Sequence, residues 1–131
     1  MSAASLIHDA NSALLVHRRL DDLQAFFAED YVAHVGGKAM KGHPWIRRAI
    51  GLLHGAFDDL SVDVEVLVEH DDRVAWQRVV RGTHVGAYAG FPATGATVTW
   101  RDMIVSRVEH GVFVEDWVVT DLAEQLLRAR K

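Results

Sequence analysis

The second half of the chain alternates apolar and polar residues with a period of two. From Leu60 to Val68 every second residue is apolar, and most of the residues between them are polar. This pattern predicts a strand with one buried side and one solvent-facing side. Further strands are predicted over residues 73–85, 97–108 and 112–120, with turn-forming residues between them. Four consecutive antiparallel strands of this length must twist, so the sheet is expected to be strongly curved.

The first half of the chain carries apolar residues at helical spacing instead. Helices are predicted over residues 6–17, over a short segment that begins at Asp21, and over residues 42–57. A short strand is predicted over Tyr31–Val35, and a last helix over residues 122–130. Helices followed by consecutive strands are typical of an α+β fold. Three N-terminal helices that close the concave side of a curved antiparallel sheet leave a cone, which is a natural pocket for a small molecule.

Composition limits the classes of function that the chain can have. Its 131 residues fit one domain, residues 1–131, and 14 basic against 18 acidic residues give a net charge of −4. Without a basic run, no binding of nucleic acid is expected. The chain has no cysteine, which excludes disulfides and thiol chemistry. No apolar run is long enough to cross a membrane and no signal peptide is recognisable, so a cytoplasmic location without membrane contact is expected.

Three short motifs carry a resemblance to a known family. They are Gly82-Thr83-His84, Pro92-Ala93-Thr94-Gly95 and Glu115-Asp116-Trp117. At these separations the motifs resemble those of the SnoaL-like polyketide cyclase (ester cyclase) family, which belongs to the nuclear transport factor two-like superfamily of cystatin-like rolls. The resemblance covers nearly the whole chain and is densest from residue 72 to residue 126. It implies a homodimer, formed through the sheet, of α+β cones that use no metal and no organic cofactor.

The resemblance also implies a reaction and a set of positions. The family's characterised cyclases perform an intramolecular aldol condensation on a polyketide ester, and an acid on the last strand, two residues after a His, takes a proton from carbon. The matching stretch places Trp117 at the His position and Val119 at the acid position. The preceding strand, where the cyclases have a Gln and a His, has Asp102 and Ile104. The acid best placed for chemistry is therefore expected one strand away, at Asp102.

Asp102 shares a strand face with large apolar residues, among them Trp100 and Ile104. A carboxyl group on such a face loses solvation, which favours its neutral form and suits it to proton transfer near neutral pH. The alternative is that Asp102 pairs with Arg78 and only holds the sheet together. Both interpretations stay open from the sequence.

Two histidines are further candidates. His34 ends the short predicted strand near the cone, where an imidazole can exchange a proton or donate a hydrogen bond to a carbonyl. The alternative is a structural histidine whose ring nitrogens have partners within the fold. His54 lies at the edge of the apolar stripe of the third helix and could reach the same space, but a half-exposed helix residue is the simpler interpretation.

Aromatic residues are the candidate walls of the pocket. Trp45, Trp76, Trp100 and Trp117 could hold a flat, mostly apolar ligand, or could be ordinary core residues, and Tyr88 lies on a loop expected beside the mouth. No pair of histidines has a metal-binding spacing, so no metal site is expected.

Three further polar residues are given structural roles. His84 is expected to anchor the glycine-rich loop that follows it, and Asp121 to cap the last helix. Glu115 alternates with Phe113 and is expected to point inward toward a structural partner.

Three functions remain open. The first is a cofactor-independent acid–base enzyme, a cyclase or isomerase, acting on a small hydrophobic carbonyl or epoxide compound with Asp102 and His34. The second is a non-catalytic domain that binds a small molecule, with Asp102 neutralised by Arg78. The third is a dimeric interaction domain with an incidental cavity.

Overall fold

The computed structural model describes residues 2–130 and contains helical segments of three kinds. The first helix, α1, is α-helical over Ala3–Ala10 and continues as a π-helical segment, η1, over Asn11–Val16. A 3-10 helix, η2, spans Leu20–Ala25. The α-helices α2 and α3 span Gly42–Ala56 and Leu122–Ala129.

Six strands form one sheet in the order β2-β1-β6-β5-β4-β3. All neighbouring strands are antiparallel except β1 and β6, which run parallel. β2 and β3 are the two free edges, so the sheet curls without closing. The strands are β1 Phe27–Val35, β2 Lys38–Lys41, β3 Phe57–His70, β4 Arg73–His84, β5 Thr97–Glu109 and β6 Val112–Thr120.

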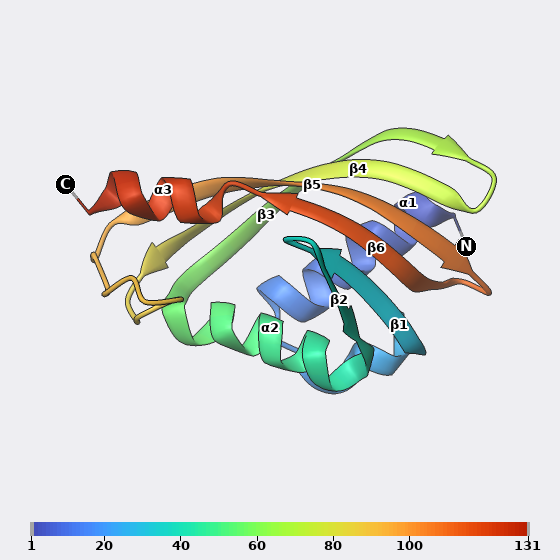
Figure 1. Ribbon diagram of the computed structural model, residues 1–131, viewed down its shortest axis with the longest axis horizontal. Coiled ribbons are helices and arrows are strands. Elements are labelled where there is room, and N and C mark those ends of the chain that lie inside the picture. The colour runs from blue at the N-terminus through green and yellow to red at the C-terminus, as the bar shows by residue number, and fades with distance from the viewer. Residues whose placement is uncertain (1, 131) are drawn as a thin grey trace.

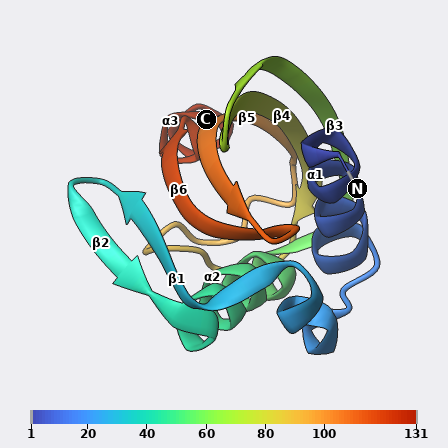
Figure 2. The same ribbon diagram turned by 90° about the vertical axis from the view of Figure 1, so that its right-hand side faces the viewer.

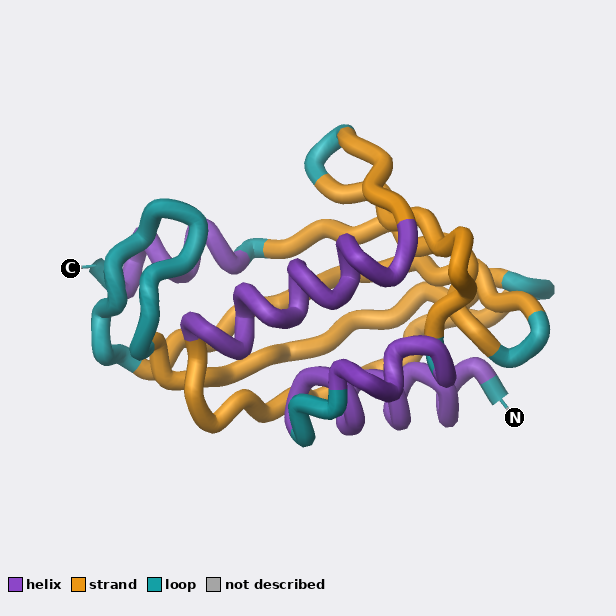
Figure 3. The backbone as a smooth tube through the Cα atoms, turned by 90° about the horizontal axis from the view of Figure 1, so that it is seen from below, coloured by secondary structure: helices purple, strands orange, loops and turns teal. Residues whose placement is uncertain are grey.

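The long strands β3 to β6 arch over α1 and α2, as Figure 1 shows. In Figure 2 the sheet wraps around an interior that α1 and α2 close from the other side, and in Figure 3 α2 runs along the underside of the sheet. The β1–β2 hairpin projects from the body of the molecule (Figures 2 and 3). The predicted α+β fold with a curved sheet and helices on its concave side is therefore confirmed.

The strands β4, β5 and β6 were predicted to within one residue, whereas β3 begins three residues before the predicted alternation and ends two residues after it, and the N-terminal part also differs. The strand predicted over Tyr31–Val35 begins four residues earlier, at Phe27, and β2 was not predicted. The exposed pair Glu29 and Asp30 hides the start of β1 in the sequence. β2 is a short edge strand that pairs with β1 across a Gly36-Gly37 turn, in which both glycines have positive φ.

A β-bulge in β6 changes which side chains face the interior. Phe113 lies opposite Val108, but Glu115 lies opposite the very next residue of β5, Arg107, so that Val114 is the extra residue. One inserted residue reverses the alternation that follows it. Phe113 is therefore buried on the concave side, and after the bulge the inward-facing side chain is that of Asp116.

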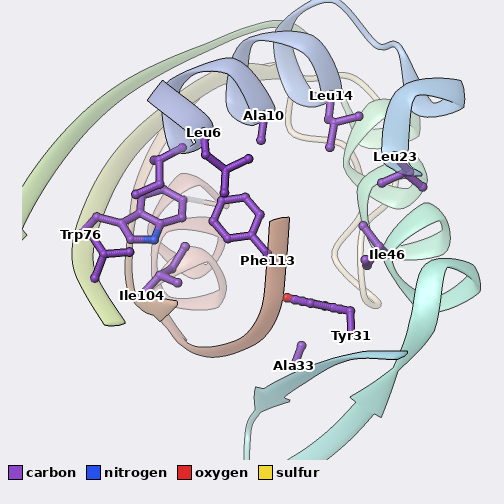
Figure 4. Packing of buried hydrophobic residues seen from close by; sticks show 12 residues of the cluster. Leu6, Ala10, Leu14, Leu23, Tyr31, Ala33, Ile46, Trp76, Ile104 and Phe113 are labelled. Atoms are coloured by element: carbon purple, nitrogen blue, oxygen red, sulfur yellow. The ribbon is translucent and has the colours of Figure 1, made fainter. Parts of the chain in front are cut away.

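Two clusters of buried apolar residues fill the interior. The larger one joins α1, η1 and α2 to the sheet, and Figure 4 shows Leu6, Trp76, Ile104 and Phe113 converging from different elements. The second cluster lies at the other end of the long strands, where Phe57, Val80, Trp100 and the helix α3 meet. The gap between helices and sheet that these clusters leave unfilled is the cavity.

Within residues 2–130, no helix is both long enough and apolar enough to cross a membrane.

Candidate active site

A cavity of about 210 Å³ lies between the concave face of the sheet and the helices η1 and α2. Most of its lining is apolar, and aromatic side chains from five elements and a loop form much of the wall. Three of the four tryptophans proposed as walls are among them, and so is Tyr88. The aromatic lining residues are Phe27, Tyr31, Trp45, Trp76, Tyr88, Trp100 and Phe113.

Asp102 lines this cavity and is 4% exposed. Its Oδ2 accepts a hydrogen bond of 2.8 Å from Nε of Arg78, the residue directly opposite on β4. Its Oδ1 is buried and has no hydrogen-bond partner among the described residues. The carboxylate therefore has one oxygen fixed by a cation and one oxygen free.

Asn11 is a second partner of the Arg78 guanidinium group. The Nη1 of Arg78 donates to Oδ1 of Asn11 over 2.7 Å, while Nδ2 of Asn11 donates to the carbonyl of Ile7 over 2.8 Å. Asn11 opens the π-helical segment, a helix form that is frequent at functional sites. The Asp102–Arg78 pair proposed from the sequence is present, but it is not bidentate.

A second buried carboxyl group, Asp116, lines the same cavity and was not among the residues predicted for the site. Its Oδ2 lies 2.5 Å from Oη of Tyr31, and its Oδ1 accepts a 2.5 Å hydrogen bond from Oγ of Ser106. Trp76 Nε1 donates in turn to Oγ of Ser106 over 3.0 Å. Burial raises the pKa of the Asp116 carboxyl above its usual range, although the hydrogen bonds from Ser106 and Tyr31 act against that rise.

The raised pKa of Asp116 predicts how stability depends on pH. The folded protein holds this proton more tightly than the unfolded chain, so the free energy of unfolding falls as pH rises from the ordinary carboxyl pKa through the raised value. An Asp116→Asn variant cannot titrate at this position and is expected to lack that decline. Urea unfolding of both proteins across a pH series measures the difference, and two parallel stability curves would contradict the prediction.

The structure places His34 outside the cavity. Tyr31 and Val35 of β1 line the cavity, so His34 points to the opposite face of the sheet, where it stacks on Trp117 at 5.1 Å between ring centroids. Its Nε2 lies 2.6 Å from Oε2 of Glu115. That hydrogen bond is the main reason why the pKa of Glu115 is lowered. The expectation that His34 lies near the cone interior is wrong, and so is the inward orientation expected for Glu115.

Trp117 and Val119 also lie on that outer face. Arg73 covers the ring of Trp117 at 5.0 Å, and Val119 is 70% exposed. Their expected place in the wall of the cavity is therefore wrong, because the bulge at Val114 shifts the alternation of β6 by one residue. The two cavity-lining positions that directly follow the bulge are Asp116 and Val118. The structure therefore places Asp116 and Val118 of β6, rather than Trp117 and Val119, in the wall of the cavity.

His54 is half-buried and is not part of the cavity lining. Its Nε2 lies 3.1 Å from the carbonyl oxygen of Leu15, and burial lowers its pKa. The simpler interpretation of His54, a half-exposed helix residue, fits this placement. Tyr88 does line the cavity, and burial together with the charge of Asp102 raises the pKa of its hydroxyl.

The remaining structural assignments hold in part. His84 is fully buried and anchors the following loop, because its Nδ1 accepts a hydrogen bond from the backbone N–H of Thr94 and lies 3.1 Å from the Thr94 hydroxyl. Asp121 stands at the start of α3, but its side chain does not cap the helix. It instead accepts hydrogen bonds from the backbone N–H of Arg101 and from the side chain of Gln125.

Across residues 2–130, no three His, Asp or Glu side chains come together in a group that could hold a metal ion.

A half-closed α+β cone around a cavity with aromatic walls is the architecture of the nuclear transport factor two-like class. The sequence matches the family model of the SnoaL-like polyketide cyclases over residues 5–128. The chain belongs to the SnoaL-like polyketide cyclase family. A search of curated proteins finds no match.

Solved structures agree with this assignment. Wild-type IdmH of Streptomyces antibioticus, described as a candidate polyketide cyclase, is similar with a TM-score of 0.83 and 25% identity, covering 98% of each chain. AclR of Streptomyces galilaeus, described as a candidate hydroxylase, has a TM-score of 0.83 and 25% identity over 96% of this chain and 79% of its own. TsrD of Streptomyces laurentii shares the fold, with a TM-score of 0.81 and 23% identity over 96% of this chain and 97% of its own. The family and the likeness to IdmH support a cyclase-type function.

Proposed function

We propose that the protein is a cofactor-independent enzyme that uses acid–base chemistry on a small, mostly apolar carbonyl compound bound in the cavity, in a reaction of the cyclase type. The observation that carries the proposal is the state of Asp102. It lines an aromatic cavity with Oδ2 held by Arg78 and with Oδ1 unpaired among the described residues. A free carboxylate oxygen in a water-poor site is a competent base for a proton on carbon.

The proposed reaction begins when Oδ1 of Asp102 removes a proton from the carbon beside the carbonyl group. The electron pair of the broken C–H bond forms an enolate, whose carbon then attacks a second carbonyl group of the same molecule. A new C–C bond closes the ring, and the proton returns from Asp102 to the resulting alkoxide. The tryptophan walls contribute by holding a flat chain folded, which brings the two reacting carbons together.

Exchange of a carbon-bound proton with solvent tests this proposal directly. Flat diketones and polyketide-like esters are incubated with the protein in deuterium oxide, and deuterium at the carbon beside the carbonyl is followed by NMR. Wild-type protein is expected to accelerate the exchange, and Asp102→Asn is expected not to. Equal acceleration by both proteins would remove Asp102 from the mechanism.

A non-catalytic binding domain is the second candidate, and the ion pair favours it. Arg78 neutralises Asp102, and Asn11 satisfies a further N–H of the guanidinium group. Such a cluster can serve only to hold the sheet and the helix together. Binding of the same compounds by wild type and Asp102→Asn, without exchange by either, supports this candidate against the enzyme.

The proposed functional unit is a homodimer formed through the outer face of the sheet. Met103, Val105 and Val119 are exposed there and surround a shallow hollow beside the β1–β2 hairpin. Asp63 of the edge strand and Arg101 of β5 lie on that same face, in one cross-strand row. A second copy turned by 180° would place the acidic side of one protomer against the basic side of the other, which favours a copy of this chain as the occupant.

A charge at the centre of this outer face is expected to separate the two protomers. In Val119→Asp, a carboxylate would have to be buried without a partner, so the dissociation constant of the dimer is expected to rise by at least about tenfold. Analytical ultracentrifugation measures this constant. Val85→Asp is the matched control, because Val85 is 48% exposed and does not line the hollow. A monomeric wild type, or a Val119→Asp dimer of unchanged affinity, would contradict the proposal.

A further inference from the structure

Four polar side chains form a continuous hydrogen-bonded chain that ends at the cavity. It starts at Trp76 on β4, passes through Ser106 on β5 and Asp116 on β6, and ends at Tyr31 on β1. All four are buried: Ser106 is 0% exposed, Trp76 and Tyr31 are 3% exposed, and Asp116 is 7% exposed. Figure 4 shows the hydroxyl group of Tyr31 pointing from β1 toward β6. The proposed reaction of Asp102 uses Trp76 only as part of the cavity wall, and it gives no role to Ser106, Asp116 or Tyr31.

The chemistry of the donors fixes which group donates and which accepts in each of these hydrogen bonds. An indole N–H only donates, so Ser106 must accept from Trp76. The single hydrogen of the Ser106 hydroxyl is then donated to Oδ1 of Asp116, over 2.5 Å. What remains is the 2.5 Å contact between Oδ2 of Asp116 and Oη of Tyr31, which has room for one hydrogen.

The protonation state of Asp116 decides which group supplies that hydrogen. If Asp116 is ionised, Tyr31 donates to it and presents no donor to the cavity. If Asp116 is neutral, its own acid hydrogen fills the contact and Tyr31 becomes the acceptor. The phenolic hydrogen must then turn elsewhere, and the cavity that Tyr31 lines is the space open to it. Burial raises the pKa of both Asp116 and Tyr31, which favours the state in which both groups are neutral.

We propose that the Tyr31 hydroxyl donates a hydrogen bond to the carbonyl oxygen of the ligand, and that Trp76, Ser106 and Asp116 are positioning residues that hold it in that orientation. The inference rests on the proposed function, because it takes the ligand to be a carbonyl compound. Negative charge develops on that oxygen as the proton leaves the neighbouring carbon. A fixed neutral donor at that oxygen stabilises this charge more strongly than it stabilises the uncharged ligand.

A pair of probes of equal shape tests the inference by binding alone. 2-Acetylnaphthalene carries an acceptor oxygen, and 2-isopropenylnaphthalene has a CH₂ group in its place. Tyr31→Phe is expected to weaken binding of the ketone by about five- to tenfold, the loss of one net hydrogen bond. Binding of the hydrocarbon is expected to stay within about twofold, since only a hydroxyl group is removed. Titration calorimetry or quenching of tryptophan fluorescence gives both constants.

Asp116→Asn separates positioning from simple packing. The amide oxygen of the substituted side chain can accept from Ser106 while its NH₂ group donates to Tyr31, which is the arrangement of the neutral acid. This variant is therefore expected to bind the ketone within about twofold of wild type. A loss as large as that of Tyr31→Phe would overturn the proposed hydrogen order. Equal effects of Tyr31→Phe on both probes, or no effect on either, would show that Tyr31 only packs.

Infrared spectroscopy gives an answer that needs no ligand. The difference spectrum between wild type and Asp116→Asn at neutral pH is expected to show the C=O stretch of a neutral carboxylic acid. A carboxylate band there would overturn the inference even if neither probe binds. Asp102→Asn is expected to keep the preference for the ketone that Tyr31 provides. Loss of exchange chemistry and loss of the Tyr31 effect are therefore separate results, and each one refutes only its own proposal.

Discussion

An Arg78→Met variant is expected to lose about 3–5 kcal/mol of unfolding free energy, the cost typical of removing one partner from a buried ion pair. Asp102 is 4% exposed, and among the described residues its side chain has one hydrogen-bond partner, Arg78, with which it also forms a salt bridge. Without Arg78, a carboxylate remains in an apolar cavity, and Oδ1 of Asn11 loses its donor as well. Chemical denaturation followed by circular dichroism measures the loss.

The double variant Arg78→Met, Asp102→Leu is the control for this prediction. Two apolar side chains in place of a buried ion pair are often neutral or stabilising, so the double variant is expected to regain most of the lost stability. A cost below about 1 kcal/mol for Arg78→Met alone would be typical of an exposed pair and would show that water reaches Asp102. The ion pair would then have little to do with the stability of the fold.

Local alternation was enough to predict the architecture and the face that carries Asp102. In β5 every second residue from Val98 to Ser106 is buried, as the pattern predicts. This works because β5 pairs with both neighbours without an inserted residue up to Arg107. The Arg78–Asp102 pair could also be proposed from the sequence, because a regular antiparallel register places these two residues opposite each other.

The same reasoning failed on β6 because a bulge is set by pairing with the neighbouring strand. Nothing within residues 112–120 shows that Val114 is the inserted residue, and without it the alternation puts Glu115 inward and Asp116 outward. The misplacement of Trp117 and Val119 follows from the same residue. The signal for Asp116 was its position beside Glu115 in an otherwise apolar strand, but its face could not be assigned without the register.

The positions of His34 and Asn11 depend on long-range contacts in a similar way. The parallel pairing of β1 with β6 places His34 opposite Trp117, on the outer face of the sheet. Asn11, at which the first helix changes to π-helical geometry, contacts Arg78 of β4, a residue far away in the sequence. Neither event has a local sequence signature, since both depend on segments that lie far apart in the chain.

In Asp102→Asn, the rate of proton abstraction from carbon is expected to fall by about 10²–10⁴-fold, the usual contribution of a positioned general base. The amide has nearly the same shape as the carboxylate, and its oxygen can still accept the hydrogen bond from Nε of Arg78. It cannot take up a proton from carbon. The loss is therefore expected in kcat, with a much smaller change in KM.

Asp9→Asn is the matched control, because Asp9 is an exposed residue of α1 that does not line the cavity. Its exchange rate is expected to equal that of wild type. Thermal unfolding of all three proteins distinguishes lost chemistry from lost folding, and Asp102→Asn is expected to bind the aromatic ketone as wild type does. If Asp102→Asn exchanged the carbon-bound proton at the rate of wild type, Asp116 would be the next carboxyl group to test as the base, because it lines the same cavity.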